Sequence, residues 1–137
     1  MNYLLDTDTC IYLMTERELK KRGRIVAHLE VVKPEETVYL SSITVSELSY
    51  GAHKGKWSKA NFALLERFIL DFTVAAFDEQ AAKVCGSIRA GLEKKGKPIG
   101  AMDLLIASHA ISLSVPLVTN DIPGFKGIPG LQIENWV

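Results

Sequence analysis

The sequence predicts an α/β fold of three layers, with a mainly parallel central sheet flanked by helices. Short apolar runs that are typical of buried strands recur along the chain, and segments of helical spacing such as residues 59–70 lie between them. Strands separated by helices form βαβ units, which place parallel strands under helices on both faces of the sheet. Because 137 residues is about the size of one domain, we expect a single domain over residues 1–137.

Two predicted strands lie in the first half of the chain. Residues 3–5 are apolar and form a short strand, and the first helix is expected to begin near Asp8. A second helix follows and is broken at residues 33–36 by a proline and charged neighbours. Residues 38–40 form the second strand, and the helix after it begins near Ile43 and ends at Gly51 or Gly55.

The second half of the chain alternates in the same way. Asp78 is an expected N-cap, because it lies between a β-rich run and a long helical pattern. The expected elements are a strand at 72–77, a helix through Leu92, a helix over about 101–113, a strand at 117–119 and a last strand near 131–133. A Gly/Pro-rich segment at 122–130 connects the last two strands.

Composition limits the protein class. The 16 basic and 16 acidic residues cancel, whereas a protein that coats nucleic acid is usually basic; a nuclease stays possible, because acids in its site can offset bases around it. Cys10 and Cys85 lack a metal-binding spacing, so we expect buried free thiols. No apolar run approaches the ~20 residues of a membrane span, and the start of the chain shows no leader pattern, so we expect a cytoplasmic protein without membrane contact.

Four acidic residues lie where predicted strands end or where the following helices begin: Asp6, Glu47, Asp103 and Asp121. In a parallel α/β sheet these positions meet at the carboxyl edge, where ligand sites form. Carboxylates gathered there repel one another unless a cation neutralises them, and hard oxygen ligands suit Mg²⁺ or Mn²⁺. The pattern therefore predicts metal-dependent phosphodiester chemistry.

Each acid also has a structural alternative. Asp6 could cap a helix, although Asp8 is better placed for that role, and the Glu47 segment fits a capping box. Asp103 lies in the first turn of a predicted helix, where the helix dipole favours a negative charge, and Asp121 suits an Asx turn. Four separate caps at one sheet edge would be an improbable coincidence, so the joint placement favours a site.

Five stretches form a recognisable pattern, in order: YLLDTD at 3–8, SITVSEL at 42–48, IGAMD at 99–103, LVTND at 117–121 and the tail at 128–136. Together they resemble PIN-domain proteins, and specifically VapC-type toxins of bacterial type II toxin–antitoxin (VapBC) pairs. The resemblance spans the whole chain. It implies a PIN-like fold and a metal-dependent endoribonuclease.

The resemblance also implies roles for single residues. Asp6, Glu47, Asp103 and Asp121 would be the catalytic, metal-binding quartet around Mg²⁺ or Mn²⁺, with Asp6 and Asp103 holding the principal ion. Thr7 and Thr119 would support them. Two positions depart from the family pattern: Asp8 stands where many relatives have Asn, and Gly124 where many have a further acid.

The implied partners are an RNA substrate, a second copy of the chain in a homodimer, and a small inhibitory VapB-type antitoxin, through which alone the protein would contact DNA. We expect an amphipathic antitoxin segment to dock on an apolar patch, although ordinary core packing also explains these residues: Ile11, Tyr12, Met14, Leu19 and Trp57. The three histidines, His28, His53 and His109, show no nucleophile partner and are expected at the surface or in packing.

Two other functions compete with this interpretation. A non-catalytic, partner-regulated subunit of a DNA-binding complex would leave DNA contact to the partner, which agrees with the zero net charge. A haloacid-dehalogenase-type phosphatase is suggested by Asp6 and Asp8, two residues apart after an apolar strand, with Asp6 as nucleophile and Asp8 as acid/base. The chain is short for that second class, and no lysine stands in a matching context.

Overall fold

A computed structural model describes residues 1–55 and 58–137 of the chain. The described residues form one five-stranded sheet in the order β3-β2-β1-β4-β5, and every neighbouring pair is parallel. The strands are β1 (Tyr3–Leu5), β2 (Val38–Ser41), β3 (Thr73–Ala75), β4 (Leu117–Val118) and β5 (Ile133–Glu134). The prediction of an α/β fold with a mainly parallel sheet is confirmed.

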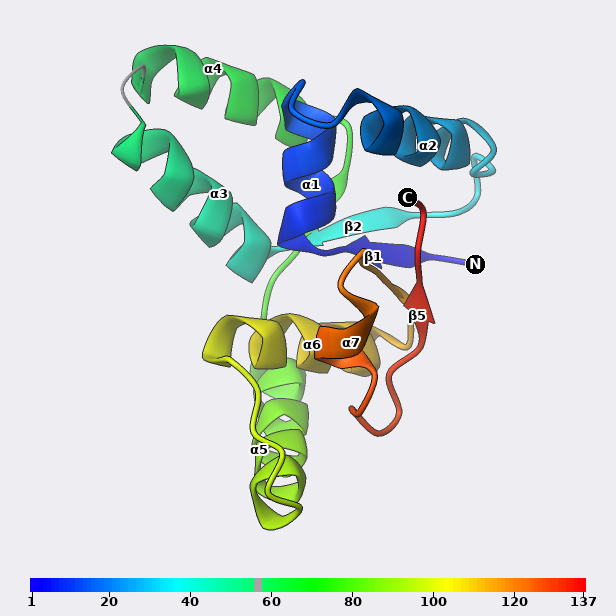
Figure 1. Cartoon of the computed structure of the whole chain (residues 1–137), viewed down its shortest axis with the longest axis vertical. Helices are drawn as coiled ribbons and strands as arrows, with labels where there is room; N and C mark the ends of the chain where they lie inside the picture. Colours follow the sequence, from blue (N-terminus) through cyan, green and yellow to red (C-terminus); the bar gives the residue numbers. More distant parts are fainter. Residues whose placement is uncertain (56–57) are drawn as a thin grey trace.

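Helices cover both faces of this sheet (Figure 1). One face carries α1 (Thr7–Met14), α2 (Leu19–Glu30), α3 (Ser42–Lys54) and α4 (Ser58–Ile69). The other face carries α5 (Glu79–Lys94), α6 (Ala101–Leu113) and the short α7 (Ile122–Phe125). The result is the three-layer arrangement that βαβ units predict.

Two hydrophobic cores lie on opposite faces of the sheet because successive strand side chains point in opposite directions. Leu4 and its neighbour Leu5 are both fully buried, but they belong to different cores. Leu4 packs with Leu104 of α6, whereas Leu5 packs with Cys10 of α1 and Ile25 of α2. A strand that is apolar at every position is therefore required here, because water reaches neither face.

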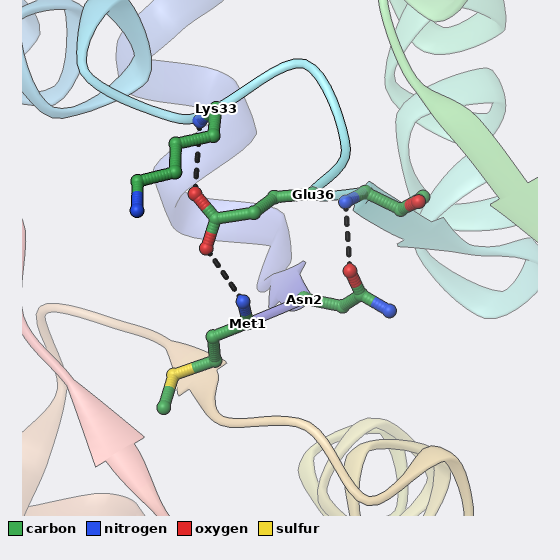
Figure 2. Close-up of polar contacts among 5 residues, drawn as sticks. Met1, Asn2, Lys33 and Glu36 are labelled. Carbon is green, nitrogen blue, oxygen red and sulfur yellow. Dashed lines mark hydrogen bonds and ion pairs between the residues drawn. The ribbon is translucent and has the colours of Figure 1, made fainter.

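The chain enters the sheet through a polar cluster at the amino ends of β1 and β2 (Figure 2). The amino group of Met1 lies 2.6 Å from a carboxylate oxygen of Glu36, whose other oxygen accepts the Lys33 backbone N–H at 2.8 Å. The Asn2 side chain accepts the Thr37 N–H at 2.8 Å. These contacts hold the first residues of β1 beside the segment that leads into β2.

Most predicted boundaries hold, and the exceptions have local causes. Asp78 caps α5 through the Ala81 N–H at 3.0 Å, as expected. The first helix begins at Thr7, next to the predicted start at Asp8, with Asp6 as its cap. β3 covers only the middle of the predicted 72–77 strand, and β5 begins at Ile133, two residues later than expected.

The structure also describes the cysteines and two of the histidines that were discussed from the sequence. Cys10 is buried and Cys85 is half-buried, and both are free thiols. His28 stacks on Trp136, and His53 meets the Phe62 ring edge-on. Within the described ranges, no helix has the length and apolar character to span a membrane.

Candidate active site

A cavity of about 660 Å³ opens at the carboxyl edge of the sheet, and all four predicted acids line it. Asp6 directly follows β1, and Asp121 lies three residues after the end of β4. Glu47 comes from the second turn of α3, and Asp103 from the first turn of α6. Asp8 is a fifth acid on the wall of the same cavity. Residues more than 110 positions apart in the sequence thus share one surface because parallel strands all end on one side.

Asp6 both caps a helix and faces the cavity. Its Oδ1 accepts the Thr9 backbone N–H at 2.8 Å, and the side chain is almost fully buried. Burial raises the pKa of Asp6, the nearby charge of Asp8 adds to the rise, and hydrogen bonds from Thr119 and Thr9 oppose it. The prediction that Asp8 is the better cap is wrong, because α1 starts one residue after the strand and leaves only Asp6 at the cap position.

Glu47 is oriented by a hydroxyl group rather than by a capping box. Helix α3 begins at Ser42 and Ser41 is its cap, so Glu47 lies too far into the helix to bond back to the cap residue. The Thr7 hydroxyl donates to Glu47 Oε1 at 2.6 Å. Thr7 therefore links the start of α1 to the acid on α3.

Asp103 lies in the first turn of α6, as the sequence predicted, and it is an exposed residue on the cavity wall. Burial raises the pKa of Asp103, and the charges of Asp121, Asp8 and Glu47 raise it further. Three carboxylates from three different elements are thus close enough to disfavour its ionisation.

Asp121 is held by its own short helix. Its Oδ1 accepts the Gly124 backbone N–H at 3.1 Å and so caps α7, while the Thr119 hydroxyl accepts the Asp121 N–H at 3.0 Å. A β-carbon at Gly124 would lie 2.3 Å from Asp121 Oδ2. The glycine, one of the two departures from the family pattern, is what allows this orientation of the carboxylate.

A buried pair connects the two helices that carry Glu47 and Asp103. His109 Nδ1 of α6 lies 2.7 Å from Ser41 Oγ at the start of α3, and both side chains are inaccessible to solvent. Burial lowers the pKa of His109, against the opposing influences of Asp78 and the Ala76 backbone. The expected packing role holds for this histidine, but the partner 68 positions away left no signal in the sequence.

No ion pair among the described residues includes an acid of the cavity. The ion pairs within residues 1–55 and 58–137 are Met1–Glu36, Lys83–Glu79 and Arg89–Glu93, and none includes a cavity acid. Among these residues, no three acidic, histidine or cysteine side chains stand close enough to hold a metal ion as they lie. The donor set nevertheless fits a hard divalent cation, because five carboxylates line one cavity and the neighbouring acids contribute to the raised pKa values of Asp6 and Asp103.

Sequence reasoning overlooked two residues on the cavity wall. Tyr50 and Met102 both line it, and their side chains are 65% and 49% exposed. Each is adjacent to a predicted acid: Tyr50 lies one helical turn after Glu47, and Met102 directly precedes Asp103. The helical spacing from Glu47 was the signal that could have revealed Tyr50.

Comparisons with known proteins agree with this geometry. The PIN-domain family model matches residues 3–129. Ribonuclease VapC2 of Rickettsia felis is 40% identical over 136 residues, and tRNA(fMet)-specific endonuclease VapC of Salmonella typhimurium is 39% identical; both alignments cover 99% of this chain and 98% of the relative.

Solved structures resemble the whole fold. The crystal structure of VapBC2 from Rickettsia felis bound to a promoter DNA fragment matches with a TM-score of 0.91 at 38% identity, covering 100% of both chains. VapBC-1 from nontypeable Haemophilus influenzae matches with a TM-score of 0.90 at 33% identity, covering 99% of this chain and 98% of the other. The chain therefore belongs to the PIN-domain family and, within it, to the VapC-type toxins of VapBC toxin–antitoxin pairs.

Proposed function

We propose that this protein is a single-domain, metal-dependent endoribonuclease, with Asp6, Glu47, Asp103 and Asp121 as its catalytic acids. The observation that carries the proposal is the shared cavity, in which these four acids face one another without a paired cation among the described residues. Unpaired like charges in one cavity cost stability and are typical of sites built for a ligand.

The cofactor would be Mg²⁺ or Mn²⁺, held by the same four acids with Asp6 and Asp103 as the principal ligands. When bound, such an ion activates water and stabilises negative charge on a scissile phosphate. Because burial and like charges raise the pKa of Asp6 and Asp103, these two acids retain protons longer than exposed carboxylates do. Binding of a cation would displace those protons, so occupancy should increase with pH.

The residues around the acids would position them. Thr7 donates to Glu47, which limits the rotation of that carboxylate before a cation arrives. Gly124 holds Asp121 through its N–H, and the hydroxyl groups of Thr9 and Thr119 act on Asp6. Hydrolysis is expected to leave 5′-phosphate and 3′-hydroxyl ends.

The names of the relatives suggest the first substrate to test. The VapC proteins of Salmonella typhimurium and Shigella flexneri, 39% and 34% identical to this chain, are named tRNA(fMet)-specific endonucleases. We propose a structured RNA of this kind, read through shape and unpaired bases.

The experiment is cleavage of an initiator tRNA panel by the wild-type protein and by Asp6→Asn, with Mg²⁺ or Mn²⁺ and with EDTA. Asn can still cap α1 through its side-chain oxygen, so this variant should fold normally. Loss of cleavage in Asp6→Asn and in EDTA supports the proposal. Cleavage by Asp6→Asn at the wild-type rate would refute the role of Asp6.

A VapB-type antitoxin is the proposed partner, and the toxin is proposed to form a homodimer. Two adjoining cavities share Met14 and Leu64, and they extend from Leu19 on α2 to Ile11, which also lines the acidic cavity. Leu19 is 66% exposed and Leu64 48%, so an apolar segment could cover them. Trp57, the fifth residue predicted for this patch, lies outside the described residues. Unchanged antitoxin affinity in Leu19→Glu would exclude Leu19 from the docking surface.

A second function follows from the structures of the relatives. The VapBC complexes of Rickettsia felis and Salmonella typhimurium were both solved bound to DNA. We propose that this chain joins a DNA-binding complex through its antitoxin, in addition to cleaving RNA. Operator binding by the complex, but not by the isolated chain, would support this division. The family assignment gives no support to the dehalogenase-type phosphatase.

A further inference from the structure

Tyr50 is a large aromatic side chain at the mouth of the acidic cavity that the proposed hydrolysis does not use. It lies three residues after Glu47 on α3, which puts both side chains on the same helical face, about 4.5 Å apart along the helix axis. The ring lines the cavity and is 65% exposed.

Tyr50 is not an isolated exposed side chain. Met102, which directly precedes Asp103, also lines the cavity and is 49% exposed. Two exposed apolar side chains therefore border a cavity whose other functional residues are acids. An apolar lip beside an ionic centre suits a ligand that has a flat apolar part next to a charged part, which is the composition of a nucleotide.

A positive charge accompanies the ring. Lys54 lies one turn further along α3, and its ammonium nitrogen is 5.7 Å from the centre of the Tyr50 ring. This distance is close to the outer limit of about 6 Å for a cation–π contact, so little energy opposes its release. Lys54 can therefore turn to a phosphate while the ring receives a base, and aromatic side chains combined with cations are how proteins bind single-stranded nucleic acid.

We propose that Tyr50 stacks on an unpaired base next to the scissile phosphate of the RNA, with Lys54 contacting a neighbouring phosphate. The proposal rests on the proposed ribonuclease function and adds the residue that positions the substrate. Stacking tolerates every base, so Tyr50 would increase affinity and set the position of the cut without selecting one sequence.

The test combines protein variants with modified RNA. The wild-type cleavage site is mapped first, and an abasic nucleotide is then placed at each position next to it. Tyr50→Leu keeps an apolar side chain but removes the stacking surface, so KM should rise about tenfold with little change in kcat. Tyr50→Phe should restore most of the lost affinity. Leu70→Ala, at an 83% exposed apolar position on another part of the surface, is the matched control and should leave KM unchanged.

The decisive readout is coupling between the ring and one base. Removing the base at one position should weaken cleavage by the wild-type protein about tenfold. The same abasic RNA should have little further effect on Tyr50→Leu, because that variant already lacks the stacking interaction. A structural role for Tyr50 would instead lower activity equally on every RNA.

Three outcomes would overturn the proposal, and they can be distinguished. If the wild-type protein cleaves no RNA, the proposed function fails and the stacking role fails with it. If the wild-type protein cleaves RNA but its abasic profile matches that of Tyr50→Leu, only the stacking role fails. If Tyr50→Leu cleaves normally but binds the antitoxin or its own copy more weakly, the ring is a protein contact.

Discussion

The two edges of the sheet shift the pKa of carboxylate side chains in opposite directions. At the amino edge, Glu36 binds the Met1 amino group and the Lys33 N–H, and the hydrogen bond from that amino group lowers the pKa of Glu36 (Figure 2). At the carboxyl edge, burial and neighbouring acids raise the pKa of Asp6 and Asp103. One carboxylate has its cation within the described fold, and the others do not.

The difference separates a structural acid from candidates for chemistry. The Glu36 pair ties two chain segments together and needs nothing further. The acids of the cavity oppose folding until something neutralises them, and such a cost is expected where function requires it. Variants that alter one edge of the sheet and leave the other intact therefore test this distinction.

The largest effect is expected from removing one charge at each edge. Asp103→Asn should reduce RNA cleavage more than about a hundredfold, because loss of a supporting residue alone costs about 10- to 100-fold and Asp103 is proposed as a direct ligand. Glu36→Gln should leave kcat/KM unchanged. Equal losses in the two variants, measured on one RNA substrate, would abolish the distinction between the edges.

A smaller loss is expected at the hydroxyl that orients Glu47. Thr7→Val keeps the side-chain shape but removes the 2.6 Å hydrogen bond, so cleavage should fall about tenfold and require more Mn²⁺. Thr73→Val, at an exposed position on β3, is the matched control. A Thr7→Val protein with the wild-type Mn²⁺ dependence would contradict a positioning role.

The buried pair that supports the carboxyl edge should contribute mainly to stability. His109→Gln removes the imidazole that hydrogen-bonds to Ser41 in a site without solvent. The free energy of unfolding should therefore fall by about 1–3 kcal/mol. Urea unfolding followed by circular dichroism measures this difference. His53→Gln, at an exposed position on α3, should change stability much less.

The smallest effects are the pH dependences, which have opposite signs at the two edges. A raised pKa means that the folded state binds the proton more tightly than the unfolded state does. Asp6 and Asp103 therefore reduce stability as the pH rises above 3.8, the usual pKa of an aspartate side chain. The lowered pKa of Glu36 gives stability above its usual 4.5 that is lost in acid. His109, lowered from 6.5, also costs stability as pH falls below that value.

Urea unfolding in EDTA checks these signs. Asp103→Asn should be more stable than the wild-type protein at pH 7, and the gap should close as the pH approaches 4. Glu36→Gln should be less stable at pH 7, and its deficit should also shrink in acid. A wild-type protein that exceeds Asp103→Asn at neutral pH without metal would show that the acid cluster is not strained.

Local patterns predicted much of this fold. The helix expected over 101–113 is α6, a segment of mostly apolar and small residues that is too long for an ordinary strand. Asp78 was predicted as a cap because a strand and a long helical pattern meet at that residue. The gathering of four acids followed from one rule about parallel strands.

Contacts between distant residues and the exact limits of short elements were not predictable in this way. The Ser41–His109 pair joins residues 68 positions apart, and neither side chain carries a local sign of its partner. The choice between Asp6 and Asp8 as the cap depended on the absence of a loop between β1 and α1. Helix α7 was read as an irregular segment, because four residues containing proline and glycine show no periodicity.

The most direct test is calorimetric titration of the wild-type protein and of Asp103→Asn with Mn²⁺ at pH 6, in two buffers of different ionisation enthalpy. We predict saturable binding by the wild-type protein with net release of protons, and weaker binding with less release by Asp103→Asn. Absence of Mn²⁺ binding to the wild-type protein, or identical affinity and proton release in the two proteins, would contradict a cation-deficient site at this edge of the sheet.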